Sequence, residues 1–185
     1  RLLLEENIAE EFTKKYVEKV KELKSGDPMH KDTFIGTMAR ADLAEDLEKQ
    51  IRASVDAGAK ILIGGERDGA YMQPTVLDGV TKEMAIFKEE TFGPAIGITR
   101  FKTAEEAIEL VNSSDFGLGV SIFTEDLEFA KNIIPEFEDG AVFVNELVKS
   151  DPRLPFGGTK ISGYGRELSL DGIQEFVNKK TVYIK

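Results

Sequence analysis

Cysteine is absent from this 185-residue sequence, and histidine occurs only once. Without cysteine, the chain can form no disulfide and no thiolate metal site, and it cannot supply a cysteine nucleophile. The single histidine, His30, lies in a polar segment and is expected to be solvated, although it is the only possible base for a serine–histidine–aspartate triad. We therefore expect neither a metal site nor nucleophilic catalysis of these kinds from the chain alone.

Basic residues are also in short supply, with 24 against 34 acidic residues and a net charge of −10. This balance argues against nucleic acids and anionic membranes as partners, because both bind basic surfaces. No apolar run approaches the roughly 20 residues that span a bilayer. The apolar run at the N-terminus is too short for a signal peptide, which predicts a cytoplasmic protein. The lack of an initiator methionine fits a chain that begins within a longer protein.

Hydrophobic residues make up 41% of the sequence and charged residues 31%, which is typical of a globular protein and at this length predicts one domain. Apolar residues recur at helical spacing in two segments near the N-terminus. Residues 5–24 are expected to form a helix whose apolar stripe is Ile8, Phe12, Tyr16, Val20 and Leu23. Residues 41–57 are expected to form a second helix with Leu43, Leu47, Ile51 and Val55 inward, ended by Gly58.

The central part of the chain alternates short strands with helices. Residues 60–65 are predicted to be a buried strand, and residues 71–77 at best an edge strand, because Pro74 cannot donate a hydrogen bond. Thr103 and Glu106 have the spacing of a capping box that starts a helix. Further strands are expected at 95–101, 117–123, 140–144 and 181–184, and helices at 104–112, 127–137 and 171–176. This order predicts an α/β fold with a mostly parallel open sheet flanked by helices.

Residues 154–167 hold four glycines and one proline in fourteen residues, so the backbone there must turn tightly or approach another segment closely. By composition alone this is a structured surface loop. Its sequence, PFGG-x-K-x-SG-x-GRE, closely resembles the C-terminal signature of the aldehyde dehydrogenase superfamily. The resemblance implies that the four glycines are conformational and that Arg166 lies at a subunit contact. The spacing of a phosphate-binding loop is absent.

Residues 88–94, KEETFGP, resemble the E-x-F-G-P motif of the same family. Without that resemblance, the segment is a solvated acidic turn. The resemblance implies that Glu90 hydrogen-bonds the ribose hydroxyls next to nicotinamide, since two acceptor oxygens suit a diol. It further implies that Phe92 packs beside the nicotinamide ring.

Two more segments, N-x-x-x-F-G-L at residues 112–118 and G-x-V-x-V-N at 140–145, also resemble the family, and there they are mainly structural. Two roles remain open for Asn145: one near the substrate, and one as a simple residue at the end of a strand. The following loop resembles the succinate-semialdehyde type, which implies that Ser150 helps to hold the distal carboxylate of the substrate. Arg153 is a candidate to pair with the substrate carboxylate, but we expect it to pair with Asp151 instead. Phe156 is implied as an aromatic wall of the substrate tunnel, with ordinary core packing as the alternative.

The resemblance covers essentially the whole chain and implies an aldehyde dehydrogenase catalytic-domain-like fold. Residues 1–178 are expected to be part of that catalytic domain and residues 179–185 an oligomerisation strand, with the cofactor-binding Rossmann-like domain absent. The implied reaction oxidises an aldehyde with NAD or NADP, and the implied assembly is a homo-oligomer (dimer or tetramer). The catalytic cysteine, the general-base glutamate and the oxyanion-hole asparagine of the family are missing here, so we expect the isolated chain to be inactive. The alternative is a non-catalytic binding or assembly module.

Overall fold

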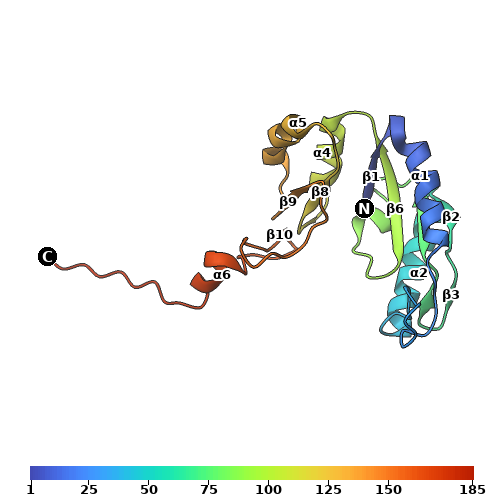
Figure 1. The fold of residues 1–185 in the computed structure, drawn as a ribbon, viewed down its shortest axis with the longest axis horizontal. Coiled ribbons are helices and arrows are strands. Elements are labelled where there is room, and N and C mark those ends of the chain that lie inside the picture. The colour runs from blue at the N-terminus through green and yellow to red at the C-terminus, as the bar shows by residue number, and fades with distance from the viewer. The chain divides into compact units, whose positions relative to one another are not determined.

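The computed structural model describes residues 1–185, which divide into two compact units, Arg1–Ala107 and Ile108–Lys185 (Figure 1). The boundary falls inside helix α4 (Ala104–Asn112). Each unit is described by itself below. The expectation that residues 1–178 act as part of one catalytic domain stays a prediction.

The first unit is built around a four-stranded sheet with strand order β1-β6-β5-β2. Its helices and strands are β1 (Leu2–Glu5), α1 (Glu6–Lys21), α2 (Ala41–Asp56), β2 (Lys60–Ile63), β3 (Arg67–Asp68), β4 (Tyr71–Met72), β5 (Thr75–Asp78), α3 (Ala85–Lys88) and β6 (Ala95–Phe101). Strand β6 pairs in parallel with β1 on one side and with β5 on the other, whereas β2 pairs antiparallel with β5. The fold is therefore α/β with a mostly parallel sheet flanked by helices, as the sequence predicted.

Helix α1 covers one face of this sheet. Its Ala9 packs in a buried cluster with Leu4, Val76 and Ile98 from three neighbouring strands. On the opposite face, Gly97 of β6 leaves room for Val80, which follows β5, and for Ile86 of α3: a Cβ at Gly97 would lie 3.1 Å from Val80. Helix α2 packs in turn against α3. The side chains of each strand alternate between the two faces, because successive residues of a strand point in opposite directions.

The N-terminal segment differs from its prediction in two ways. Residues 2–5 form a strand, and the helix begins only at Glu6. The buried side of α1 is formed by Ala9 and Thr13, whereas Ile8 and Phe12 of the predicted stripe are 54% and 39% exposed. Tyr16 and Val20 of the predicted stripe do pack against the buried cluster, so the prediction was wrong only for Ile8 and Phe12 in the first half of the helix.

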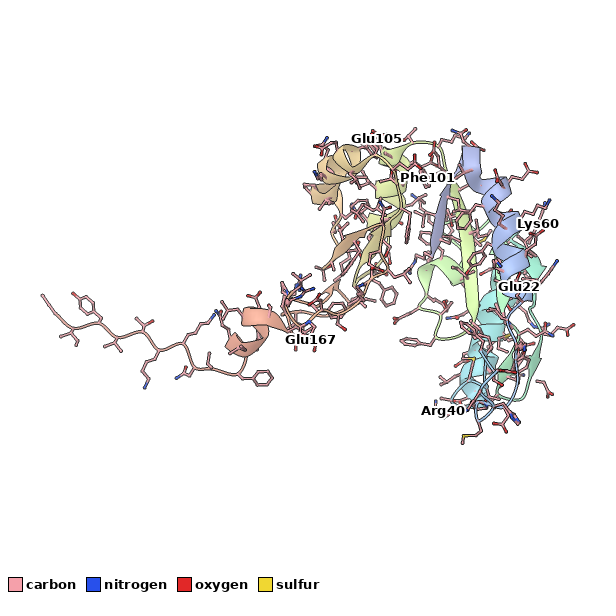
Figure 2. The ribbon with its side chains drawn as sticks, viewed as in Figure 1. Glu22, Arg40, Lys60, Phe101, Glu105 and Glu167 are labelled. Atoms are coloured by element: carbon pink, nitrogen blue, oxygen red, sulfur yellow. The ribbon has the colours of Figure 1, made fainter.

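The burial of two strands was also predicted wrongly. Residues 60–63 form a strand, but it lies at the sheet edge, and its Lys60 side chain points outward (Figure 2). Conversely, β5 lies inside the sheet with Val76 and Leu77 fully buried. Pro74 is compatible with this position because the strand begins one residue after it, at Thr75. The helix stop at Gly58 is confirmed by its φ of 111°.

The second unit contains two small sheets. Its elements are β7 (Phe116–Gly117), β8 (Val120–Ile122), α5 (Leu127–Ile133), η1 (Ile134–Glu136), β9 (Val142–Val144), β10 (Thr159–Lys160) and α6 (Ser169–Gln174), together with the end of α4. Strands β8 and β9 pair in parallel, and β10 pairs antiparallel with β7. The predicted helix at 127–137 and strand at 140–144 are thus present in shortened form, and the helix predicted at 171–176 lies two residues earlier. The single strand predicted at 117–123 was wrong, because β7 and β8 belong to different sheets.

Residues 181–184 form no strand within the chain, and the side chains of Val182, Tyr183 and Ile184 are 72–88% exposed. The predicted pairing of this segment with a neighbouring subunit stays a prediction. None of the helices is both long enough and apolar enough to span a lipid bilayer.

Candidate functional site

The turn that carries Glu90 and Phe92 lies in the first unit, between α3 and β6. Helix α2 packs directly beneath it: a Cβ at Gly93 would come within 2.5 Å of Leu47 and 3.0 Å of Met38. Real Cβ atoms do not approach that closely, so a larger residue at Gly93 would require the ends of the Leu47 side chain on α2 and of the Met38 side chain, which precedes α2, to shift. The carbonyl of Pro94 accepts a hydrogen bond of 2.8 Å from the Thr75 amide at the start of β5. The turn is therefore fixed to both the helix and the sheet.

The two adjacent glutamates of this turn have different surroundings. The Glu89 carboxylate accepts a hydrogen bond of 2.9 Å from Nε2 of Gln50 on α2. The Glu90 carboxylate is exposed and has no partner within the chain, while its main-chain carbonyl lies 3.4 Å from the same Gln50 nitrogen. The Phe92 ring is 74% exposed. A carboxylate with both oxygens available and an exposed aromatic ring fit a sugar diol joined to a flat heterocycle, so the residues present fit the nicotinamide riboside end of NAD or NADP.

The segment that enters β1 is held beside this turn by Arg1. Its Nε donates to the Phe87 carbonyl at 2.6 Å, and its guanidinium lies 5.3 Å from the centre of the Phe87 ring. Because β1 and β6 are parallel and Leu2 pairs with Ile98, the N-terminal ends of both strands lie at the same edge of the sheet. Sequence reasoning missed this contact, since nothing local to Arg1 indicates a partner 86 residues away.

The loop with Ser150 belongs to the second unit, and its charged residues pair with one another. Arg153 donates to both carboxylate oxygens of Asp151, from Nε at 2.9 Å and from Nη2 at 2.6 Å. These hydrogen bonds hold the pKa of Asp151 well below its usual range. Lys149 pairs with Glu146 at 2.7 Å. Ser150 itself is exposed, and its hydroxyl has no partner in the chain.

Phe156 begins the glycine-rich loop and is half-buried. Its backbone exchanges two hydrogen bonds with Glu167, of 2.9 and 2.8 Å, so the loop is closed at its base. Arg166 donates from Nη1 to the carbonyls of Gly158 and Gly165 at 3.0 and 2.7 Å. Arg166 thus supports the loop from within this unit. The sequence had predicted only a subunit contact for this residue.

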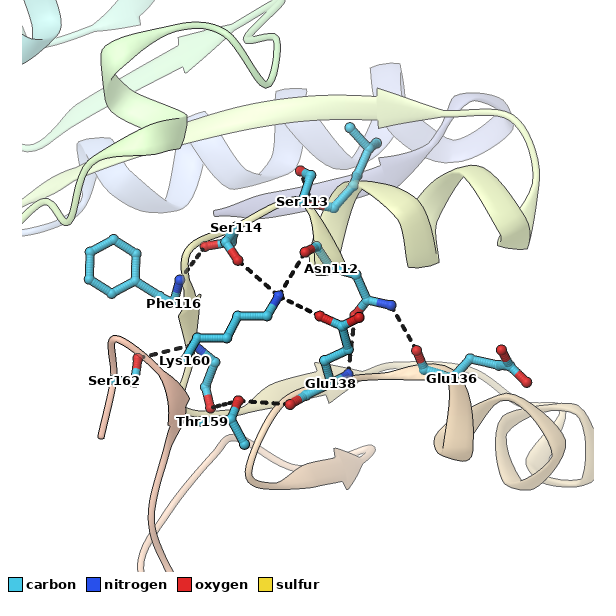
Figure 3. Close-up of polar contacts among 11 residues, drawn as sticks. Asn112, Ser113, Ser114, Phe116, Glu136, Glu138, Thr159, Lys160 and Ser162 are labelled. Carbon is cyan, nitrogen blue, oxygen red and sulfur yellow. Dashed lines mark hydrogen bonds and ion pairs between the residues drawn. The ribbon is translucent and has the colours of Figure 1, made fainter. Parts of the chain in front are cut away.

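A polar cluster formed by Asn112, Glu138, Thr159 and Lys160, which we call the Lys160 cluster, anchors the same loop (Figure 3). Nζ of Lys160 donates to the Asn112 and Ser114 carbonyls at 2.7 and 2.9 Å and pairs with Glu138 at 2.7 Å. The Asn112 side chain donates to the Glu136 carbonyl and accepts from the Glu138 amide. The lysine of the GG-x-K motif therefore has a structural role, and its place in the motif was the only sign of it in the sequence.

Asn145 acts as a strand-end residue in this unit. It follows β9 with a positive φ of 55°, and its side chain both accepts from the Thr124 amide at 2.9 Å and donates to the Thr124 carbonyl at 2.8 Å. This double hydrogen bond joins the ends of β8 and β9. Of the two roles open from the sequence, the geometry favours the structural one.

The predicted site residues thus form two pairs. Glu90 and Phe92 share one turn of the first unit, and Ser150 and Phe156 share one loop of the second. Each pair combines a polar group that has no partner in the chain with an aromatic residue of the same turn or loop. The binding roles of all four residues stay predictions.

Comparison with known proteins identifies the family to which this chain belongs. Residues 1–182 match the model of the aldehyde dehydrogenase family, so the chain belongs to this family. The chain is 46% identical over 186 residues to the succinate semialdehyde dehydrogenase [NAD(P)+] Sad of Escherichia coli (strain K12), covering 99% of this chain and 40% of that protein. The chain therefore spans about 40% of the length of the curated relatives that it matches.

Solved structures show the same fold. The NAD-dependent aldehyde dehydrogenase of Sinorhizobium meliloti aligns with a TM-score of 0.91 and 38% identity over 95% of this chain and 36% of that one. Aldehyde dehydrogenase 21 of Physcomitrella patens, in complex with the reaction product succinate, aligns with a TM-score of 0.90 and 34% identity over 95% of this chain and 37% of that one.

Proposed function

We propose that this chain is the downstream part of the catalytic domain of an NAD(P)-dependent aldehyde dehydrogenase that oxidises succinate semialdehyde or a similar aldehyde to the carboxylate. The single observation that carries the proposal is the turn of Glu90 and Phe92 in a member of this family, which holds an unpartnered carboxylate and an exposed ring two residues apart in the chain. The names of the relatives, which include NAD(P)+-dependent and NAD-dependent enzymes, support the choice of cofactor.

In this proposal, Glu90 orients the nicotinamide end of the cofactor. Its two carboxylate oxygens accept hydrogen bonds from the two ribose hydroxyls, and charge-assisted bonds of this kind are about twice as strong as neutral ones. Phe92 places its apolar ring against the nicotinamide and excludes water from that side. When bound, the cofactor supplies the hydride acceptor. Because the turn packs on α2, both side chains stay in place and the turn does not have to rearrange when the cofactor binds.

Ser150 and Phe156 are proposed to contact the aldehyde. The Ser150 hydroxyl is free to donate to the distal carboxylate of a semialdehyde, whereas Arg153 is already paired with Asp151. A cation for that carboxylate must therefore come from another part of the complete enzyme. Phe156 is proposed as a wall of the substrate tunnel. Succinate bound to the Physcomitrella relative supports a dicarboxylate product.

The isolated chain is proposed to be inactive, because it contains no cysteine to attack the aldehyde carbonyl. Residues 179–185 are proposed to add a strand to a neighbouring copy in a homo-oligomer, which would cover Val182, Tyr183 and Ile184. Turnover of aldehyde by the isolated chain would contradict its proposed inactivity. A stable monomer of the complete enzyme in sedimentation would contradict the proposed homo-oligomer. The cytoplasmic location stays a prediction.

The decisive experiment substitutes Ser150→Ala and Glu90→Gln in the complete enzyme. We expect Ser150→Ala to raise the KM for succinate semialdehyde about tenfold and to leave the KM for butanal, which lacks the distal carboxylate, within about twofold. We expect Glu90→Gln to weaken cofactor binding about tenfold, since a neutral acceptor replaces a charged one. Equal effects of Ser150→Ala on both aldehydes, or unchanged cofactor binding by Glu90→Gln, would contradict the corresponding role.

A further inference from the structure

We infer that Gln50 on helix α2 is a positioning residue for Glu90, an inference that rests on the proposed function of Glu90. Gln50 lies 40 residues before Glu90 in the chain, yet its side-chain amide contacts the turn in two places. It donates to the Glu89 carboxylate at 2.9 Å and lies 3.4 Å from the Glu90 carbonyl.

The helix that carries Gln50 is itself firmly joined to the segment before the turn. Ser54 is fully buried, and its hydroxyl accepts from the Ile86 amide at 2.9 Å while donating to the Gln50 carbonyl at 2.8 Å. Residues 47, 50 and 54 lie on one helical face because they are spaced three and four apart. Leu47 of the same face contacts Gly93 at the far end of the turn. One face of α2 therefore supports the backbone from Ile86 to Gly93.

The contacts of Gln50 determine which of the two adjacent glutamate carboxylates is free to bind the cofactor. An amide nitrogen carries two hydrogens, so it can serve the Glu89 carboxylate and the Glu90 carbonyl at once. Glu89 is thereby held against α2, and the Glu90 backbone is fixed, while the Glu90 carboxylate keeps both oxygens free. Without the Gln50 amide, the other contacts would still hold the two ends of the turn, but Glu89 and the Glu90 backbone would lose their anchor on α2, so the orientation of Glu90 would be less well defined.

The test replaces Gln50 by methionine, which has a similar length and helix propensity but no donor. The matched control is Gln73→Met, because the Gln73 amide also contacts a carboxylate, that of Glu66 at 3.4 Å, away from the turn. In the complete cofactor-free enzyme, we expect Gln50→Met to speed amide hydrogen exchange of residues 90–93 several-fold and Gln73→Met to leave it unchanged. We further expect Gln50→Met to raise the Kd of NAD(P) about fivefold.

Combination with Glu90→Gln separates positioning from other effects. If Gln50 acts through Glu90, Gln50→Met should change the Kd by less than about twofold in the Glu90→Gln background. An equal loss in both backgrounds, or unchanged exchange and Kd in the single variant, would overturn the inference. If Glu90→Gln weakens cofactor binding and Gln50→Met does not, only the positioning role fails. If Glu90→Gln itself has no effect, the proposed role of Glu90 fails and the inference falls with it.

Discussion

Nζ of Lys160 donates a hydrogen bond of 2.7 Å to the main-chain carbonyl of Asn112, a residue 48 positions earlier in the chain (Figure 3). This contact joins the glycine-rich loop to the end of α4. A charged donor satisfies carbonyls that the last turn of a helix leaves without intrahelical partners. The loop of Phe156 is therefore held by the Lys160 cluster as well as by its own glycines.

Replacement of Lys160 by methionine should destabilise the chain. The change leaves the Asn112 and Ser114 carbonyls and the Glu138 carboxylate without their common partner. We expect a loss of about 2 kcal/mol in the free energy of unfolding, measured by urea denaturation followed by circular dichroism. The control Lys149→Met breaks a pair whose side chains are 58% and 51% exposed, so it should cost less than about 0.5 kcal/mol. Similar losses in both variants would contradict the anchoring role.

Asn145 should tolerate glycine better than alanine. Both substitutions remove the two hydrogen bonds to Thr124, which we expect to cost about 1–2 kcal/mol. Alanine additionally has to adopt the positive φ of 55°, which costs about 1 kcal/mol more, whereas glycine adopts it freely. Denaturation of the two variants side by side measures the difference. If alanine proves as stable as glycine, backbone conformation is not what favours asparagine here.

Thr13→Val should stabilise the chain. The Thr13 hydroxyl is buried on the inner side of α1 and has no hydrogen-bond partner, so its desolvation is uncompensated. Valine has the same shape without the polar atom, and we expect a gain of about 1 kcal/mol in the free energy of unfolding. Thr37→Val, at an exposed position, is the control and should change the free energy by less than about 0.5 kcal/mol. A loss of stability in Thr13→Val would show that the hydroxyl has a partner in solution.

The pair of Asp151 and Arg153 should make the Ser150 loop sensitive to acid. Hydrogen bonds from Arg153 lower the pKa of Asp151, so the carboxylate stabilises the folded loop above its ordinary pKa of about 3.9. That contribution is lost as the pH falls through the lowered pKa, and it is constant at neutral pH. Arg153→Gln should raise the pKa of Asp151 towards its ordinary value in a carbon-detected NMR titration, whereas Arg52→Gln should not. An unchanged pKa in Arg153→Gln would contradict the pairing.

Local signals predicted several elements well. The capping box is present: the Glu106 amide lies 3.3 Å from the Thr103 hydroxyl, and the Glu106 carboxylate accepts from the Lys102 amide, one residue before the expected one. The amphipathic helix before Gly58 and the strand at 95–101 were also predicted correctly. The candidate site residues were proposed from their resemblance to family motifs, and their roles stay predictions.

The sequence by itself determined the features that depend on neighbouring residues, namely the capping box, the glycine turns and the alternation of strands and helices. Its composition alone excluded a cysteine nucleophile within the chain. Only the tertiary structure decided that β5 lies inside the sheet and β2 at its edge, and that α1 buries Ala9 while Ile8 is exposed. It alone placed Gln50 beneath the turn of Glu90. Burial and hydrogen bonds between distant segments depend on which elements pack together, and local spacing carries no information about that choice.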